Sequence, residues 1–182
     1  MKVIKTGFPE VLEILPTVYK DNRGYFFESY NKKIFRENGI NCELLQFMHS
    51  QSIKNTIRGL HYQVYPNPQA KIVYVIDGKI MDVIVDIRHG SPKFGEHIKI
   101  EISSRKKNQV YIPIGFAHGF SVLSKSATVA YMVSGEYSKD DERGIMYNDR
   151  TLNIKWNIKN PILSKKDLNN MLFESINKDF DY

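Results

Sequence analysis

Residues 71–87 read KIVYVIDGKIMDVIVDI, two apolar runs on either side of an Asp-Gly dipeptide. Val, Ile and Tyr favour extended strands, and Asp77-Gly78 supplies the positive φ angles that a tight type I′ turn needs. In the second run Val83, Val85 and Ile87 share one face, whereas residues 82, 84 and 86 share the other. The stretch therefore predicts a β-hairpin and an antiparallel fold.

Short strand-like runs fill most of the remaining chain. Further strands are expected at residues 11–19, 25–30, 98–102, 108–112, 121–123 and 128–133. One helix is expected between Asn31, a good N-cap, and Gly39, a good stop, and a weaker signal marks Asp167–Ile176. Strands at about ten-residue spacing are typical of a sandwich or small barrel. We expect one all-β domain over residues 1–182, with a few short peripheral helices.

Composition narrows the class of protein. The chain has 182 residues, 42% of them hydrophobic, which is enough for a real core without disulfides. The formal net charge is +6, but the basic residues are interleaved with acids, and runs such as Arg105-Lys106-Lys107 are usually solvated loops. No nucleic-acid-binding signature is present. A small phosphorylated ligand would explain the charge equally well.

The same reading predicts a cytoplasmic protein. Cys42 stands alone, which excludes an internal disulfide and fits a reducing compartment. Pro9, Glu10 and Glu13 interrupt the N-terminal region, so no signal peptide is expected. No run approaches the length of about 18 apolar residues that a membrane span needs.

Two segments contain residues that are candidates for catalysis or substrate binding. The first is IRGLHYQ at residues 57–63, followed by QAK at 69–71, and the second is YIPIGFAHGF at 111–120. Each sets a His, His61 or His118, beside small residues. By residue type alone, these would be satisfied core histidines.

Together with DNRGYFFE at residues 21–28, these segments closely resemble the dTDP-4-dehydrorhamnose 3,5-epimerase family. The resemblance continues, in order, through DVIVDIR, SPKFG, ERGI and ILSKKD, which begin at residues 82, 91, 142 and 162. It implies a cupin-type jelly-roll β-barrel, a homodimer, a nucleotide-diphosphate sugar substrate, and no cofactor or metal.

The resemblance also implies roles for four residues. Inverting a carbon beside a ketone needs a base, an acid on the opposite face, and a donor or cation for the enolate oxygen. By resemblance, His61 is the base and Asp167 orients it, Tyr131 is the acid, and Lys71 stabilises the enolate. Without the family, Tyr131 would be a core tyrosine, and Lys71 and Asp167 ordinary surface charges.

The resemblance assigns further positions to the substrate. Arg58 matches a diphosphate contact, for which a guanidinium is well suited. His118 matches a His near the sugar, with Asp82 as a candidate partner. The remaining matches to nucleotide-sugar positions are Arg23, Phe27, Glu28 and Gln46, some of which are expected to reach across from a second subunit.

Several positions depart from the family pattern: Phe47, Met48, Tyr74, Asp77, Met132 and Glu136. The family usually carries Asp-Asn where this chain has Phe47-Met48, and Met accepts hydrogen bonds only weakly. These changes are expected to fall mainly on positions that could bind the sugar or the nucleotide. A different nucleotide, a heptose such as a GDP-linked one, or inversion at C3 alone therefore stay open.

Three other readings stay open as well. A metal-dependent cupin is one, because residues 113–118 fit the second cupin motif. The first motif needs two His separated by one residue and then a Glu, whereas His61 is followed by Tyr62 and Gln63, with no Glu before Lys71. A non-catalytic sugar-nucleotide binding protein and a ketoisomerase are the others. The default prediction is epimerisation of dTDP-4-keto-6-deoxyglucose to dTDP-4-keto-L-rhamnose through an enolate.

Overall fold

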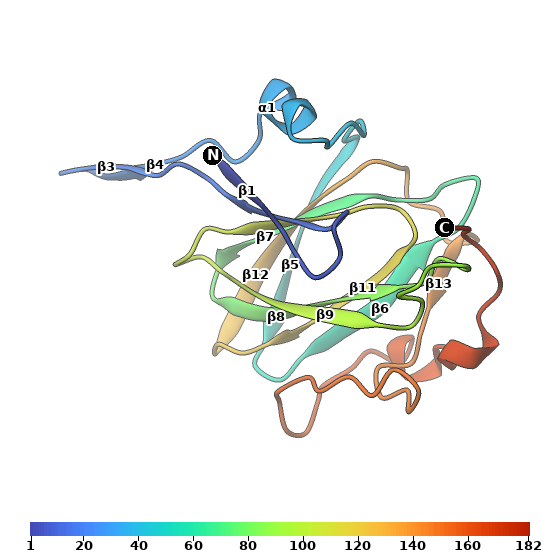
Figure 1. Ribbon diagram of the computed structural model, residues 1–182. Helices are drawn as coiled ribbons and strands as arrows, with labels where there is room; N and C mark the ends of the chain where they lie inside the picture. The colour runs from blue at the N-terminus through green and yellow to red at the C-terminus, as the bar shows by residue number, and fades with distance from the viewer.

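Two antiparallel sheets make up the body of the protein, of which a computed structural model describes residues 1–182 (Figure 1). The six-stranded sheet has the order β1 (Lys2–Lys5), β2 (Leu12–Leu15), β10 (Gln109–Ile112), β7 (Lys71–Asp77), β12 (Ser126–Val133) and β5 (Gln46–Ile53). The five-stranded sheet has the order β13 (Glu142–Gly144), β6 (Ile57–Gln63), β11 (Phe116–Val122), β8 (Lys79–Asp86) and β9 (His97–Ser103). The prediction of an all-β fold with few helices is confirmed.

The stretch 71–87 does not form the predicted hairpin. β7 pairs with β10 and β12, whereas β8 pairs with β9 and β11 in the other sheet. Only Gly78, at φ +86°, has the positive φ that a type I′ turn requires at both central residues. The Asp-Gly dipeptide therefore carries the chain from one sheet to the other.

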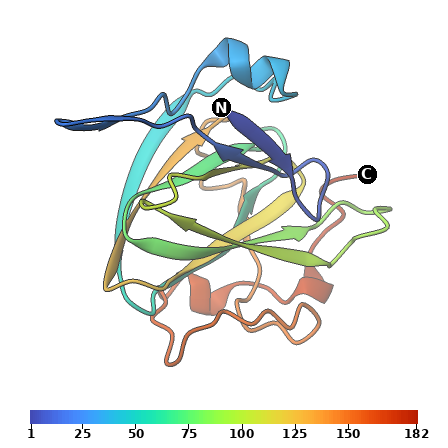
Figure 2. The same cartoon turned by 60° about the vertical axis from the view of Figure 1, so that its left-hand side comes forward.

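This crossing explains why β8 is apolar on both faces. Ile84 packs into the core between the sheets with Val75 of β7 and Val129 of β12. Val83 and Val85 point the opposite way and pack in a second cluster with residues of the C-terminal segment. Figure 2 shows this segment, in orange and red, lying along the outside of the five-stranded sheet.

The N-terminal strands are shorter than predicted. The expected strand at 11–19 ends at Leu15, because Pro16 cannot donate to a strand ladder. Of its remainder only Tyr19 lies in a strand, as the first residue of β3 (Tyr19–Asp21), which pairs with β4 (Gly24–Phe26) in a separate two-stranded arm. The expected strand at 25–30 ends at Phe26, and the arm projects from the body (Figure 1). β1, β5, β6 and β13 were not predicted, and β11 begins before the expected strand at 121–123.

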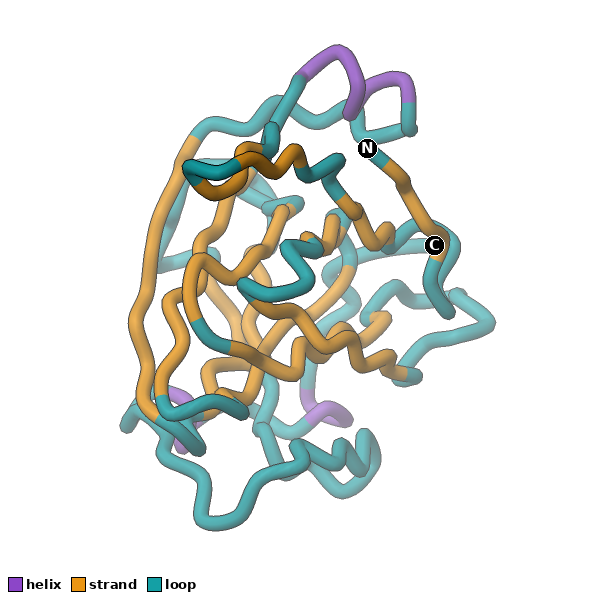
Figure 3. Tube along the Cα trace, turned by 90° about the vertical axis from the view of Figure 1, so that its left-hand side faces the viewer, coloured by secondary structure: helices purple, strands orange, loops and turns teal.

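Helix is confined to short pieces at the periphery (Figure 3). The first, α1 (Lys32–Glu37), is confirmed, and the Asn31 side chain caps it by accepting from the N–H groups of Lys33 and Ile34. No helix of the chain combines the length and the apolar character that crossing a membrane would take.

The expected C-terminal helix at 167–176 is wrong. The chain instead forms two 3₁₀ turns, η1 (Asp167–Asn169) and η2 (Phe173–Ser175). Between them the backbone of Met171 exchanges hydrogen bonds with Gly144 and Met146, beside β13. A backbone that pairs along a strand edge cannot continue a helix.

The corner at Gly78 gives a test of the fold. A Cβ on Gly78 would collide with the carbonyl oxygen of Ser126, whereas a Cβ on Gly90, at a similar φ of +84°, would meet nothing within 4 Å. Gly90→Ala should cost about 1 kcal/mol of unfolding free energy from φ strain alone. Gly78→Ala should cost about 3 kcal/mol, because the clash adds to the same strain. Urea unfolding measures both variants, and equal losses would mean that the corner tolerates a side chain.

Candidate active site

A cavity of about 310 Å³ opens between the two sheets. Its walls come from β5, β6, β7, β11 and β12. The lining residues are Met48, His49, Ser50, Arg58, His61, Gln69, Lys71, His118, Phe120, Tyr131 and Val133. The cavity thus brings together Arg58, His61, Lys71, His118 and Tyr131 from the predicted site.

His61 and Asp167 form a short hydrogen-bonded pair. His61 Nε2 lies 2.6 Å from Asp167 Oδ1, although 106 residues separate the two in the sequence. The Asp167 side chain is almost fully buried, and that of His61 is 27% exposed toward the cavity. Burial raises the pKa of Asp167, but hydrogen bonds with His61 and Ser164 and the nearby charges outweigh it and hold that pKa below its usual value. An ionised Asp167 accepts a hydrogen bond from the imidazole and so fixes the orientation of the ring.

An irregularity in β6 lets two of its side chains reach the same cavity. In a regular strand, residues three apart, such as Arg58 and His61, point to opposite faces. Here Gly59 has φ +119°, and the pairing of β6 with β11 shifts register between His118 and Phe120. A Cβ on Gly59 would lie 2.7 Å from the His118 carbonyl oxygen, so only glycine permits this approach.

The ammonium group of Lys71 is largely shielded from water. Burial lowers the pKa of its ammonium group to about 8, although the carboxylates of Glu142 and Asp82 act to raise it. Glu142 in turn pairs with Lys166 and accepts a hydrogen bond from Tyr137. An ammonium group of this kind is well suited to stabilise a developing anion.

Tyr131 enters the cavity from the opposite sheet to His61. Val129 on the same face of β12 lies in the apolar core, against which the Tyr131 ring packs. The Tyr131 hydroxyl lies 3.1 Å from Ser50 Oγ. Burial raises the pKa of the phenol well above its ordinary value, and the Ser50 hydrogen bond and the Arg58 charge offset only part of this effect.

His118 is held by a second carboxylate. Its Nε2 lies 2.7 Å from Asp82 Oδ1, and both side chains are buried. Burial raises the pKa of Asp82, against the opposing effects of His118 and Lys71. No group of three or more His, Cys, Asp or Glu side chains is placed to hold a metal ion.

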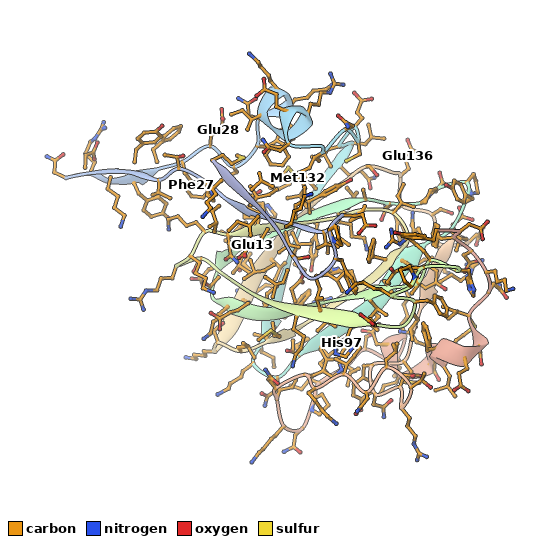
Figure 4. The ribbon with its side chains drawn as sticks, in the orientation of Figure 1. Glu13, Phe27, Glu28, His97, Met132 and Glu136 are labelled. Atoms are coloured by element: carbon orange, nitrogen blue, oxygen red, sulfur yellow. The ribbon has the colours of Figure 1, made fainter.

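The structure does not bring Arg23, Phe27, Glu28 or Gln46 into this cavity. Arg23 sits at the tip of the arm, where its exposed guanidinium pairs with Asp21 at 2.6 Å. Phe27 and Glu28 follow β4 near the root of the arm (Figure 4). Gln46 begins β5, and its Oε1 is buried without a partner.

Among the departures from the family pattern, only Met48 lines the cavity. Met132 packs on the opposite face of β12, against the apolar cluster that contains Phe35 of α1 (Figure 4). The Phe47 and Tyr74 rings stack with their centroids 6.3 Å apart, and neither of them lines the cavity. Met48 is thus the one departure from the family pattern that lies in the cavity of a single chain.

No role in the site was predicted for Ser50 or for the wall residues His49, Gln69, Phe120 and Val133. The period of β12 alone would have placed Val133 beside Tyr131. Ser50 could be found only from the pairing of β5 with β12, which connects strands more than 70 residues apart.

A family model and curated relatives of this chain both point to the same family. The model of the family described as dTDP-4-dehydrorhamnose 3,5-epimerase matches residues 5–175. The dTDP-4-dehydrorhamnose 3,5-epimerase of Shigella flexneri is 48% identical over 174 residues, covering 95% of this chain and 96% of that protein.

Solved structures that resemble this chain come from the same family. That of the dTDP-6-deoxy-D-glucose-3,5-epimerase of Legionella pneumophila, in complex with dTDP-4-keto-L-rhamnose, has a TM-score of 0.95 and 40% identity, covering 100% of this chain and 98% of that one. The dTDP-4-dehydrorhamnose 3,5-epimerase of Bacillus anthracis, with TDP and PPi bound, has a TM-score of 0.92 and 41% identity, covering 94% and 98%. This likeness confirms the predicted cupin-type jelly roll.

Proposed function

The chain belongs to the dTDP-4-dehydrorhamnose 3,5-epimerase family, and on that premise we propose that it converts dTDP-4-keto-6-deoxyglucose to dTDP-4-keto-L-rhamnose. It is an isomerase that acts on a sugar nucleotide. One observation carries the proposal: the carboxylate-bound His61 and the partly buried Tyr131 enter one cavity from opposite sheets, and Lys71 enters it from β7, the neighbour of the strand that bears Tyr131.

His61 removes the proton. Its Nε2–H donates to Asp167, which leaves Nδ1 free to accept a proton from the carbon beside the C4 ketone. The electron pair of the broken C–H bond moves onto the C4 oxygen and forms an enolate. The Lys71 ammonium stabilises that oxygen, and Asp167 stabilises the imidazolium.

Tyr131 returns a proton to the opposite face of the same carbon. The enolate collapses to the ketone, the Tyr131 phenol becomes a phenolate, and the configuration is inverted. The same sequence at the second carbon completes a double epimerisation. Before each further inversion, including that at the second carbon, the imidazolium loses its proton and the phenolate regains one, by exchange with solvent or by transfer from the imidazolium.

Substrate binding uses the rest of the predicted site. Arg58 lines the cavity and pairs with the diphosphate. The arm carries Arg23 away from the cavity of its own chain and exposes Tyr25 and Phe26. These features support a homodimer in which the arm, with Phe27 and Glu28, reaches the partner's cavity.

Incubation with dTDP-4-keto-6-deoxyglucose in D₂O tests the function. Deuterium uptake at both C3 and C5, with an inverted product, is the expected result by mass spectrometry and NMR. Uptake at one carbon would make the protein a mono-epimerase. No uptake with this substrate or with GDP- and CDP-linked 4-keto sugars would favour a non-catalytic binding protein.

Tyr131→Phe should separate the two proton transfers. The variant keeps His61 and Lys71, so exchange into recovered substrate should continue, while formation of inverted product should fall by about 10²- to 10⁴-fold. The ratio of washed-in deuterium to product is the measurement. A variant with near-normal inversion would exclude Tyr131 as the acid.

A further inference from the structure

We propose that Ser50 is a positioning residue for the acid step: its hydroxyl holds the Tyr131 hydroxyl and stabilises the phenolate that remains after Tyr131 gives up its proton. This inference rests on the function proposed above, within which Ser50 has no role so far.

The geometry singles out Ser50. Its Oγ lies 3.1 Å from Tyr131 Oη, and this is the one hydrogen bond that the phenol makes within the chain. On the paired strands Ser50 lies opposite Val129, so Tyr131 is its diagonal neighbour two residues along β12. Diagonal cross-strand neighbours lie within reach of an aromatic side chain. The contact is therefore fixed by the register of β5 and β12.

The surroundings of Tyr131 make a donor necessary. Its ring packs against the apolar core, and the Phe120 ring lies 6.5 Å away. A phenolate formed there has lost most of its solvation by water, which disfavours the charged form. A serine hydroxyl rotates freely, so Ser50 can accept from the neutral phenol and then donate to the phenolate. Hydrogen bonds to an ionised oxygen are stronger than neutral ones.

A second serine on the same face of β5 serves a different group. Ser52 Oγ accepts a hydrogen bond of 2.9 Å from Arg58 Nε. Ser52 is buried, and it holds the guanidinium that we assign to the diphosphate. Two similar side chains on one strand thus support acid and substrate separately, which gives a matched pair of variants.

The kinetic test compares Ser50→Ala with Ser52→Ala, and uses Gln51→Ala as the neutral control because the Gln51 side chain does not line the cavity. In Ser50→Ala, formation of inverted product should fall about 10- to 100-fold, the effect of one hydrogen bond to a charged group. Deuterium exchange into recovered substrate should change less than about twofold, because His61 is untouched. Ser52→Ala should mainly raise KM, and Ser50→Thr should restore inversion.

A parallel loss of exchange and inversion in Ser50→Ala, or no loss of either, would overturn the proposal. The first would indicate a merely structural role, and the second would mean that the phenolate needs no donor from β5.

A titration of the ligand-free protein tests Ser50 independently of turnover. Difluorotyrosine at position 131 brings the phenol into an accessible pH range and is followed by ¹⁹F NMR. The other titratable or charged groups around Tyr131 stay the same in both proteins: His49, Arg58, His61, Lys71, Asp82 and His118. Removing a donor to the phenolate disfavours the charged form, so Ser50→Ala should raise the midpoint by about one pH unit.

An unchanged midpoint would refute the contact even if the enzyme is active. If the wild-type protein exchanges no 4-keto sugar nucleotide, the proposed function fails, and the titration still decides whether Ser50 supports Tyr131.

Discussion

His61→Ala should abolish deuterium exchange and epimerisation together, with kcat/KM lower by about 10⁴-fold. Exchange requires removal of the carbon-bound proton, and no other lining group is paired with Asp167 in a way that could replace the imidazole. Tyr131→Phe should lose inversion alone, so the two variants differ in what survives. Deuterium uptake and product are measured in the same reaction by NMR.

Two controls test whether the effect comes from the base itself. His97→Ala removes a partly exposed histidine of β9 that lies outside the cavity (Figure 4), and it should retain activity within about twofold. Asp167→Asn keeps the imidazole but removes the carboxylate that orients it, and it should lose about 10²-fold in kcat. Exchange at the wild-type rate in His61→Ala would assign the base to another residue.

The sequence predicted which side chains share the cavity better than it predicted which strands pair. The hydrophobic pattern of 71–87 identified two strands, but a local pattern does not say which strand pairs with which. β7 pairs with β10 and β12, and β8 pairs with β9 and β11, so each strand has both of its edges occupied by strands other than its neighbour in sequence. The Asp77-Gly78 dipeptide also predicted a type I′ turn, which needs a positive φ at both residues, but only Gly78 has one. Non-local pairing is set by tertiary packing, which overrides local preference.

The same limit explains the C-terminal segment. Residues 167–176 carry a weak helical pattern, but Met171 pairs beside β13, and Phe173 packs into the second apolar cluster. Asp167 nevertheless lies where the family motif predicts, because the motif marks a side chain that must meet His61. The role of Ser50 carries no local signal at all, since its partner is 81 residues away.

Lys71→Met should lower kcat/KM by about 10²- to 10³-fold, because no other ammonium group lines the cavity to stabilise the enolate oxygen. The loss should appear in both exchange and inversion, since each passes through the enolate. Methionine preserves much of the length of the lysine side chain, so thermal unfolding should show that the fold is retained. Normal exchange in Lys71→Met would move enolate stabilisation to His118 or Arg58.

The pH dependence provides a sharper test of the same residue. Burial lowers the pKa of Lys71 to about 8 in the free enzyme. The ammonium form is present below that pH and is lost above it, so kcat/KM should decline as the pH rises through about 8. Lys71→Arg carries a charge that does not titrate in this range, so whatever activity it retains should lack the decline. Removing the Glu142 charge with Glu142→Gln should shift the wild-type decline to lower pH, because that carboxylate acts to raise the Lys71 pKa. A decline that persists unchanged in Lys71→Arg would belong to another group, and Lys71 would then act by position alone.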